Sequence, residues 1–123
     1  MRFPAKQRLR SQLDFKEVRK RGRTFRTGYF FLQLLIPETR DPPIRRLGII
    51  TSRRVGNAVK RNHAKRVLRE IFRQNQDAHP ENCDIVVVMR NTYNELTFWE
   101  LKTLYLKGIR YLSQSNRQSR KPS

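Results

Sequence analysis

Residues 56–74 read GNAVKRNHAKRVLREIFRQ, and the pattern in this stretch decides the fold. At about 100° per residue, its apolar side chains gather on one side of a helix. These apolar residues are Ala64, Val67, Leu68, Ile71 and Phe72. The pattern predicts an amphipathic helix that opens at Gly56-Asn57, runs to about Gln74 and packs its apolar side against a sheet.

The opposite side of this helix is basic. Its members are Asn62, Lys65, Arg66, Arg69 and Arg73, with Arg61 at the edge. A solvated helix face normally interleaves acids with bases because Glu–Lys pairs stabilise it, yet Glu70 is the only acid between Arg53 and Arg73. The imbalance favours a phosphate-binding face over a merely solvated one, and the planar arginine donors suit bidentate contacts. Asn62 is either a ligand of sugar or phosphate or an incidental polar residue.

Three apolar runs around this helix predict strands. Residues 29–36 are aromatic and aliphatic and end at Pro37. Residues 47–51 predict a second strand, a candidate return strand of a hairpin with the first. The apolar run within 84–89 predicts a strand buried on both faces, as a parallel or central strand is.

Capping signals place a short helix before these strands. Ser11 is an N-cap residue, with Asp14 three positions later as a variant of the capping box. Gly22 follows two cations and is a typical helix stop. We therefore expect a helix over residues 12–21.

A last helix begins at Thr97, with Glu100 as its capping-box partner, and ends near Leu112. Several of its apolar residues have the spacing of a core-facing side. They are Phe98, Leu101, Leu104, Tyr105 and Leu112. Trp99 falls outside this set and is the aromatic residue that we expect to be exposed.

The sequence thus predicts one α+β domain in a chain of 123 residues. Residues 1–10 are basic and without periodicity, which predicts an N-terminal arm. Residues 11–113 are predicted to form the α+β domain, which includes the basic helix and is the part that we expect to bind RNA on the grounds given below. Residues 114–123 contain Ser, Arg and Pro and predict a disordered basic tail.

Charge indicates the partner. The chain has 28 Lys and Arg against 10 Asp and Glu, a formal net charge of +18. Self-repulsion of this size destabilises a compact state unless a polyanion neutralises it. Nucleic acid is the expected partner, and an anionic membrane surface is the weaker alternative.

Other features argue against a secreted or membrane protein. Cys83 is the only cysteine, so no intramolecular disulfide can form, and it reads as an inert buried thiol. No apolar stretch approaches the roughly 20 residues of a membrane span, and the first residues lack the apolar middle of a signal peptide. We expect a cytoplasmic protein with no membrane partner.

No residues with the pattern of a catalytic site are visible. The two histidines, His63 and His79, lie in different elements, and the carboxylates are scattered. Asp77, Glu81 and Asp84 are close in sequence, but a polar loop is an ordinary place for acids. A metal site needs three or four converging ligands. We therefore predict no catalytic residue, no metal site and no cofactor on this chain.

The basic helix resembles the signature of the bacterial ribonuclease P protein. The family pattern Arg-Asn-x-x-Lys-Arg-x-x-Arg matches Arg61, Asn62, Lys65, Arg66 and Arg69 without a gap. His63 stands where the family usually has a second arginine. The segments Arg8-Leu9, Asp14-Phe15 and Arg21-Gly22 are similar to the N-terminal part of the family. The resemblance covers roughly residues 5 to 112.

The resemblance implies a subunit of a ribonucleoprotein endoribonuclease. In this family the RNA is catalytic and uses divalent metal, for which Mg is expected, and it removes the 5′ leader of precursor tRNA. The implied partners are this catalytic RNA and precursor tRNA, and the isolated protein is predicted to be inactive. The implied fold has the order α-β-β-β-α-β-α, with about four strands and a left-handed βαβ crossover.

Two sets of residues are the candidate sites. The first set binds RNA and comprises Arg53, Arg54, Asn57, Lys60, Arg61, Asn62, Lys65, Arg66, Arg69 and Arg73. The second set is implied by the resemblance and forms a cleft for the single-stranded leader: Phe15, Arg19, Phe31 and Gln33. An aromatic such as Phe15 can stack on a base, but Phe15 also fits a core position beside Leu13 and Val18.

Two other functions share these electrostatics. A ribosomal or other structural RNA-binding protein would have a basic face but no leader cleft. A helix-turn-helix DNA regulator fits poorly, because its recognition helix follows a partner helix after a short turn, whereas strand-like residues precede this one. We expect no DNA partner.

Overall fold

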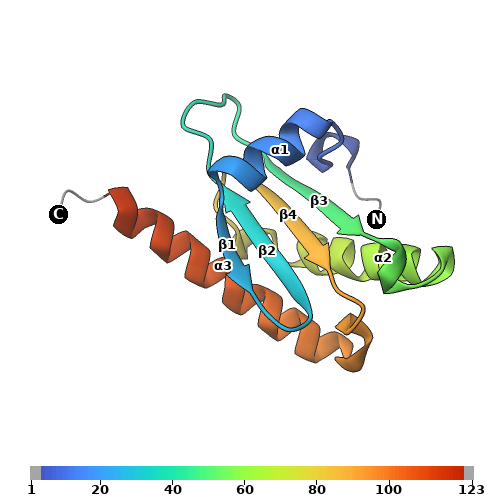
Figure 1. The fold of residues 1–123 in the computed structure, drawn as a ribbon. Coiled ribbons are helices and arrows are strands. Elements are labelled where there is room, and N and C mark those ends of the chain that lie inside the picture. The colour runs from blue at the N-terminus through green and yellow to red at the C-terminus, as the bar shows by residue number, and fades with distance from the viewer. Residues whose placement is uncertain (1–3, 121–123) are drawn as a thin grey trace.

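In the computed structural model, residues 4–120 are described, with side chains to residue 114 (Figure 1). The order of helices and strands is the predicted α-β-β-β-α-β-α. The elements are α1 Gln12–Arg21, β1 Arg23–Arg26, β2 Phe30–Leu35, β3 Arg45–Thr51, α2 Ala58–Gln74, β4 Cys83–Met89 and α3 Phe98–Arg120. Short 3₁₀ turns join them: η1 Ala5–Gln7, η2 Arg53–Val55, η3 Gln76–Ala78 and η4 Tyr93–Glu95.

The four strands form one mixed sheet in the order β1-β2-β4-β3. Strand β4 is central and parallel to β3, as its apolar run predicts. The prediction that β2 and β3 are candidates for one hairpin was wrong. Strand β4 lies between them, and β2 instead forms a hairpin with β1. Strands β3 and β4 are joined through α2, which is the parallel crossover for which the resemblance implies a left-handed turn.

The sequence analysis did not locate strand β1. Its four residues, Arg-Thr-Phe-Arg, contain one apolar side chain, so no run marks it. Phe25 packs against α3 at Gly108, where an added Cβ would lie 2.6 Å from the Phe25 ring. The charged residues at the two ends of the strand, Arg23 and Arg26, are typical of an edge strand that does not pair further.

Helices cover both faces of the sheet (Figure 1). Helices α2 and α3 bury the larger core on one face, with Leu32, Leu68, Ile85 and Tyr105 fully covered. On the other face, α1 and the N-terminal segment cover a smaller cluster around Val86. The core-like spacing predicted in α3 is confirmed, and Trp99 is 68% exposed, although Tyr111 is exposed as well.

The helix caps follow the predicted signals. Ser11 Oγ accepts from the Asp14 amide at 3.0 Å, and Asn57 Oδ1 accepts from the Lys60 amide at 3.0 Å. Thr97 and Glu100 form a full capping box, each accepting from the other's amide at 3.1 and 2.9 Å. These caps satisfy amides that a helix start leaves without partners.

The structure describes part of each terminal segment. In the predicted N-terminal arm, residues 4–10 lie along β3, where Leu9 is buried and its amide donates to Leu47 O at 3.0 Å. Helix α3 continues past Leu112 to Arg120, since no Gly or Pro interrupts the sequence before Pro122. Of the tail predicted to be disordered, residues 121–123 lie outside the described part.

Candidate RNA-binding surfaces

Helix α2 presents its basic face to solvent. Its opposite side, with Ala64, Leu68, Ile71 and Phe72, is buried and fixes the rotation of the helix. Asn62 and Arg66 are exposed, while Lys65 and Arg69 are half-buried along one edge. Among the described residues, no acid pairs with the three cations of this group. We call Asn62, Lys65, Arg66 and Arg69 the α2 face.

Arg73 differs from the other cations of the helix. It forms an ion pair with Glu70, which also accepts a hydrogen bond from Gln74 at 2.8 Å. The hydrogen bond from Arg73 holds the pKa of Glu70 below its ordinary value. The charge of Arg73 is therefore partly neutralised within the helix, and we expect it to be the weakest phosphate ligand of the predicted set.

The N-terminal end of α2 has mixed roles. Arg53, Arg54 and Lys60 are exposed cations. Asn57 caps the helix, and the Arg61 guanidinium donates to Gly56 O at 2.9 Å, so both hold the start of the helix. These contacts use one donor of Arg61 and leave the rest of its guanidinium available for RNA.

The edge of α2 away from Lys65 and Arg69 carries His63. Its Nδ1 lies 3.3 Å from the Tyr93 hydroxyl, which also donates to Lys60 O at 3.3 Å. The position where the family usually has a second arginine is therefore turned towards η4. Having His63 in place of an arginine lowers the positive charge on the edge of α2 next to η4, and it leaves the charge of the α2 face unchanged.

A basic hollow joins α2 to the N-terminal segment. It has a volume of about 290 Å³, and its lining includes Arg8, Arg10, Lys65 and Arg69. Burial, with a smaller contribution from the charge of Arg8, lowers the pKa of Arg69. Four cations around one hollow favour an anionic ligand. The sequence analysis did not include Arg8 and Arg10 among the candidate RNA-binding residues; the alternation of cations around the apolar Leu9 was the available signal.

The leader cleft predicted beside α1 has a counterpart in the structure. A second hollow, of about 480 Å³, is lined by Gln12, Leu13, Phe15, Lys16, Arg19 and Ile50. Phe15 lines both hollows, and its ring lies over Gly48, where an added Cβ would be 2.5 Å from Phe15 Cζ. The position of the half-buried Phe15 ring fits both a core residue and a cleft residue. Part of the ring packs on the smaller core, and part faces the hollow.

The other two predicted cleft residues lie on the same sheet face but do not line this hollow. Phe31 is paired with Val88, and Gln33 with Val86, whose side chain belongs to the cluster beneath α1. Both are half-buried. The structure thus brings Phe15 and Arg19 together and leaves Phe31 and Gln33 further along the sheet.

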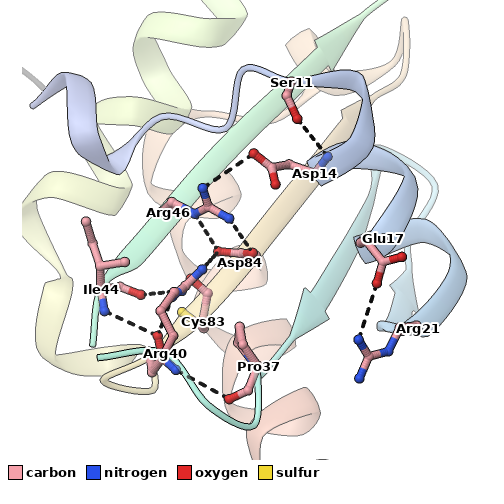
Figure 2. Close-up of polar contacts among 11 residues, drawn as sticks. Ser11, Asp14, Glu17, Arg21, Pro37, Arg40, Ile44, Arg46, Cys83 and Asp84 are labelled. Atoms are coloured by element: carbon pink, nitrogen blue, oxygen red, sulfur yellow. Dashed lines mark hydrogen bonds and ion pairs between the residues drawn. The ribbon is translucent and has the colours of Figure 1, made fainter. Parts of the chain in front are cut away.

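A buried ion-pair network holds α1 and the loop before β3 in place (Figure 2). The Asp84 carboxylate, 5% exposed, accepts from Arg40 Nη1 and from Arg46 Nε and Nη2, each at 2.9 Å. Arg46 Nη1 also lies 3.4 Å from Asp14 Oδ2 on α1. Its hydrogen bonds with Asp84 raise the pKa of Arg46. Two guanidiniums thus hold both oxygens of Asp84, and Arg46 links this buried acid to Asp14 on α1.

His79, Cys83 and Tyr105 are buried titratable groups. His79 Nε2 is 2.8 Å from the Tyr105 hydroxyl, and its Nδ1 is 2.8 Å from Asn75 O. Burial lowers the pKa of His79 to about 4 and raises that of Cys83 to about 12. Both groups are therefore neutral near pH 7, and the expected burial of Cys83 is confirmed.

The described part of the chain was compared with two further kinds of feature, a metal site and a membrane-spanning helix, and it contains neither. Among those residues, no group of three or more His, Cys, Asp or Glu could hold a metal ion. None of the described helices combines the length and apolarity needed to cross a membrane.

Comparisons with known proteins identify the family to which the chain is similar. A family model described as Ribonuclease P matches residues 3–112. A ribonuclease P protein component from Desulforapulum autotrophicum is 40% identical over 100 residues, covering 81% of this chain and 83% of the relative. A relative of the same name from Thermotoga maritima is 35% identical over 112 residues, covering 88% and 93%.

Solved structures show the same fold. The ribonuclease P protein from Thermotoga maritima superposes with a TM-score of 0.73 at 32% identity, covering 85% of this chain and 96% of that one. The ribonuclease P protein from Staphylococcus aureus gives a TM-score of 0.70 at 25% identity, covering 89% and 94%.

Proposed function

The chain belongs to the ribonuclease P protein family, and from this premise we propose that it binds the catalytic RNA of ribonuclease P and the 5′ leader of precursor tRNA. As the protein subunit, it assists the endonucleolytic cut that removes the leader and forms the mature 5′ end. The comparisons support the subunit role, and they do not favour a ribosomal protein with similar electrostatics.

The unpaired cations of the α2 face are the observation that carries this proposal. Lys65, Arg66 and Arg69 lie on one face of a helix whose other side is buried, so their positions are fixed before RNA arrives. Cations that repel one another in the free protein gain favourable partners when phosphates approach. The catalytic RNA supplies a dense row of such phosphates, so we assign it to the α2 face.

The hollow beside α1 is assigned to the leader. Phe15 offers a ring for base stacking, and Arg19 and Lys16 offer charge for the backbone. The Asp84 network fixes α1 over the sheet and so sets the width of the cleft. Arg8 and Arg10 join this cleft to the α2 face through the basic hollow, which lets one protein contact both RNAs.

The protein contributes binding and positioning in this proposal. The catalytic RNA, with divalent metal such as Mg, carries the hydrolysis, and the isolated protein is inactive. The site of action is the cytoplasm, where precursor tRNA is processed. The residues that bind RNA in this proposal are the predicted cations of α2 and its N-terminal end and the predicted cleft residues, together with Arg8, Arg10 and Lys16.

Co-purification from the native host tests this assignment. The tagged chain is expected to retain one stoichiometric RNA that, after reconstitution with the purified protein and Mg²⁺, cuts precursor tRNA at the mature 5′ end. Recovery of ribosomal RNA alone, with no cleavage activity in the reconstituted mixture, would point to the structural RNA-binding alternative.

A further inference from the structure

His63 lies on the exposed side of α2 between two cations. Lys60 and Arg66 stand three residues before and after it, and all three side chains are exposed. Residues three apart on a helix are neighbours, with Cβ atoms about 5–6 Å apart. Arg66 belongs to the α2 face, so His63 is one turn away from a cation that is assigned to phosphate. We call Lys60, His63 and Arg66 the α2 row.

Tyr93 fixes the tautomer of the His63 ring. The Tyr93 hydroxyl has one hydrogen, which it donates to Lys60 O at 3.3 Å. Its oxygen then accepts from His63 Nδ1, which lies 3.3 Å away, so Nδ1 carries the hydrogen of the neutral ring. Tyr93 is buried, and the centroids of the two rings are 6.5 Å apart. The lone pair is therefore on Nε2, and a proton that this ring takes up binds there.

The described part of the chain offers no anion to a proton on Nε2. None of the described residues bonds to this nitrogen, and no described acid forms an ion pair with His63. Glu95, the acid of η4, is exposed and does not pair with it. A protonated His63 adds a third positive charge to the α2 row, and like charges one turn apart destabilise a helix. The charged ring therefore needs an anion from outside the protein.

The second histidine does not contribute near neutral pH. His79 is 4% exposed, both of its ring nitrogens have partners, and burial lowers its pKa to about 4. Histidine is the side chain that ordinarily changes its charge between about pH 5 and pH 8. The chain has two histidines, so proton uptake by a histidine in this range comes from His63.

We propose that His63 is a proton-linked ligand of RNA phosphate: when the catalytic RNA binds along the α2 row, Nε2 takes up a proton from solvent and donates it in a hydrogen bond to a phosphate oxygen. The neutral imidazole plus one proton gives the imidazolium, and the resulting bond is charge-assisted. The inference deepens the proposed function, because the RNA is the one assigned to the α2 face. The affinity of the protein for this RNA then rises as the pH falls.

Binding of the catalytic RNA between about pH 5.5 and pH 8 tests the inference. The affinity is measured at constant ionic strength for wild type, for His63→Gln, which is polar but does not titrate, and for His63→Arg, which is permanently charged. His79→Gln controls for the other histidine, and Arg110→Ala, at an exposed site on α3, controls for the loss of one cation. Calorimetry in two buffers of different ionisation enthalpy counts the protons taken up on binding. Melting curves check that every variant folds.

The expected result is a gain in affinity at low pH that depends on His63. Wild type should bind roughly three- to tenfold more tightly at the lower pH and take up as much as one proton per complex. His63→Gln should lose both the gain and the proton uptake but match wild type at the higher pH, whereas His63→Arg should bind tightly at both. His79→Gln and Arg110→Ala should keep the pH dependence.

Three results would each overturn the inference: proton uptake that persists in His63→Gln, a loss in His63→Gln that is equal at both pH values, or a His63→Arg variant that binds no better than His63→Gln at the higher pH. If wild type shows no pH dependence while Arg66→Ala weakens binding, the inference fails and the assignment of RNA to the α2 face stands. If Arg66→Ala has no effect either, both fail.

Discussion

Replacing Phe15 by Ala separates the two roles that the structure gives its ring. The half-buried ring packs over Gly48 and also lines the cleft. A fully buried Phe→Ala change costs about 3–5 kcal/mol of stability, so a half-buried ring should cost about 1–2 kcal/mol. A base–aromatic stack contributes about 1–3 kcal/mol, and the lower half applies here because Arg19 and Gln33 add no second ring.

The assay compares two substrates with one holoenzyme. Phe15→Ala should weaken binding of precursor tRNA by about 1–2 kcal/mol, or roughly 5- to 30-fold, and leave binding of mature tRNA nearly unchanged. The matched control is Phe25→Ala, since Phe25 is partly buried against the opposite core. This variant should lower the melting temperature without changing the ratio of the two affinities. If Phe15→Ala weakens both substrates equally, Phe15 serves only as packing and the cleft assignment is refuted.

Three further predictions concern stability and chemistry. The pKa of His79 is about 4 when folded and about 6.5 when unfolded, so below pH 6.5 the unfolded state binds more protons and stability falls by up to about 3 kcal/mol towards pH 4. Urea unfolding at pH 7 and pH 4.5 should show this loss in wild type and less of it in His79→Gln; an equal loss in both would exclude His79 as its source. Asp84→Ala should cost about 3–5 kcal/mol, because it leaves Arg40 and Arg46 without their buried partner, and a change below 1 kcal/mol in the same unfolding assay would contradict the network. RNA-free protein should leave precursor tRNA intact, and cleavage that disappears on mutating a carboxylate such as Asp77 would show that the protein itself is a nuclease.

The sequence predicted the elements that have strong local patterns. Helix α2 has an uninterrupted apolar side, and α1 and α3 carry caps, so their starts agree with the structure. Strand β1 has one apolar residue among cations, and a period of two cannot be recognised in it. The end of α3 was also missed, because polar composition alone does not stop a helix, and no Gly or Pro follows Leu112 before Pro122.

The residue pattern alone predicted the part of the candidate RNA-binding site that lies on helix α2. The cations of α2 share a face because of helical geometry, which a sequence displays directly. Arg8 and Arg10 join them through the pairing of the N-terminal segment with β3; the alternation around Leu9 marks an extended segment but does not say which strand it pairs with. The Arg46–Asp84 ion pair links residues 38 positions apart in the same way. The order of strands decides both contacts, and the sequence alone suggested the wrong partner for β3.

The salt dependence of RNA binding tests the central claim most directly. Each lost phosphate contact should reduce the slope of log affinity against log salt concentration by about one unit or less. Wild type is compared with Ala variants of Arg61, Lys65, Arg66 and Arg69 on the catalytic RNA, with Arg110→Ala as the charge-matched control. The account predicts a smaller slope for Lys65, Arg66 and Arg69, a weaker effect for Arg61, which also bonds to Gly56, and no change for Arg110. Slopes that are unchanged in all four variants, or reduced as much in Arg110→Ala, would contradict the assignment of the α2 face to RNA.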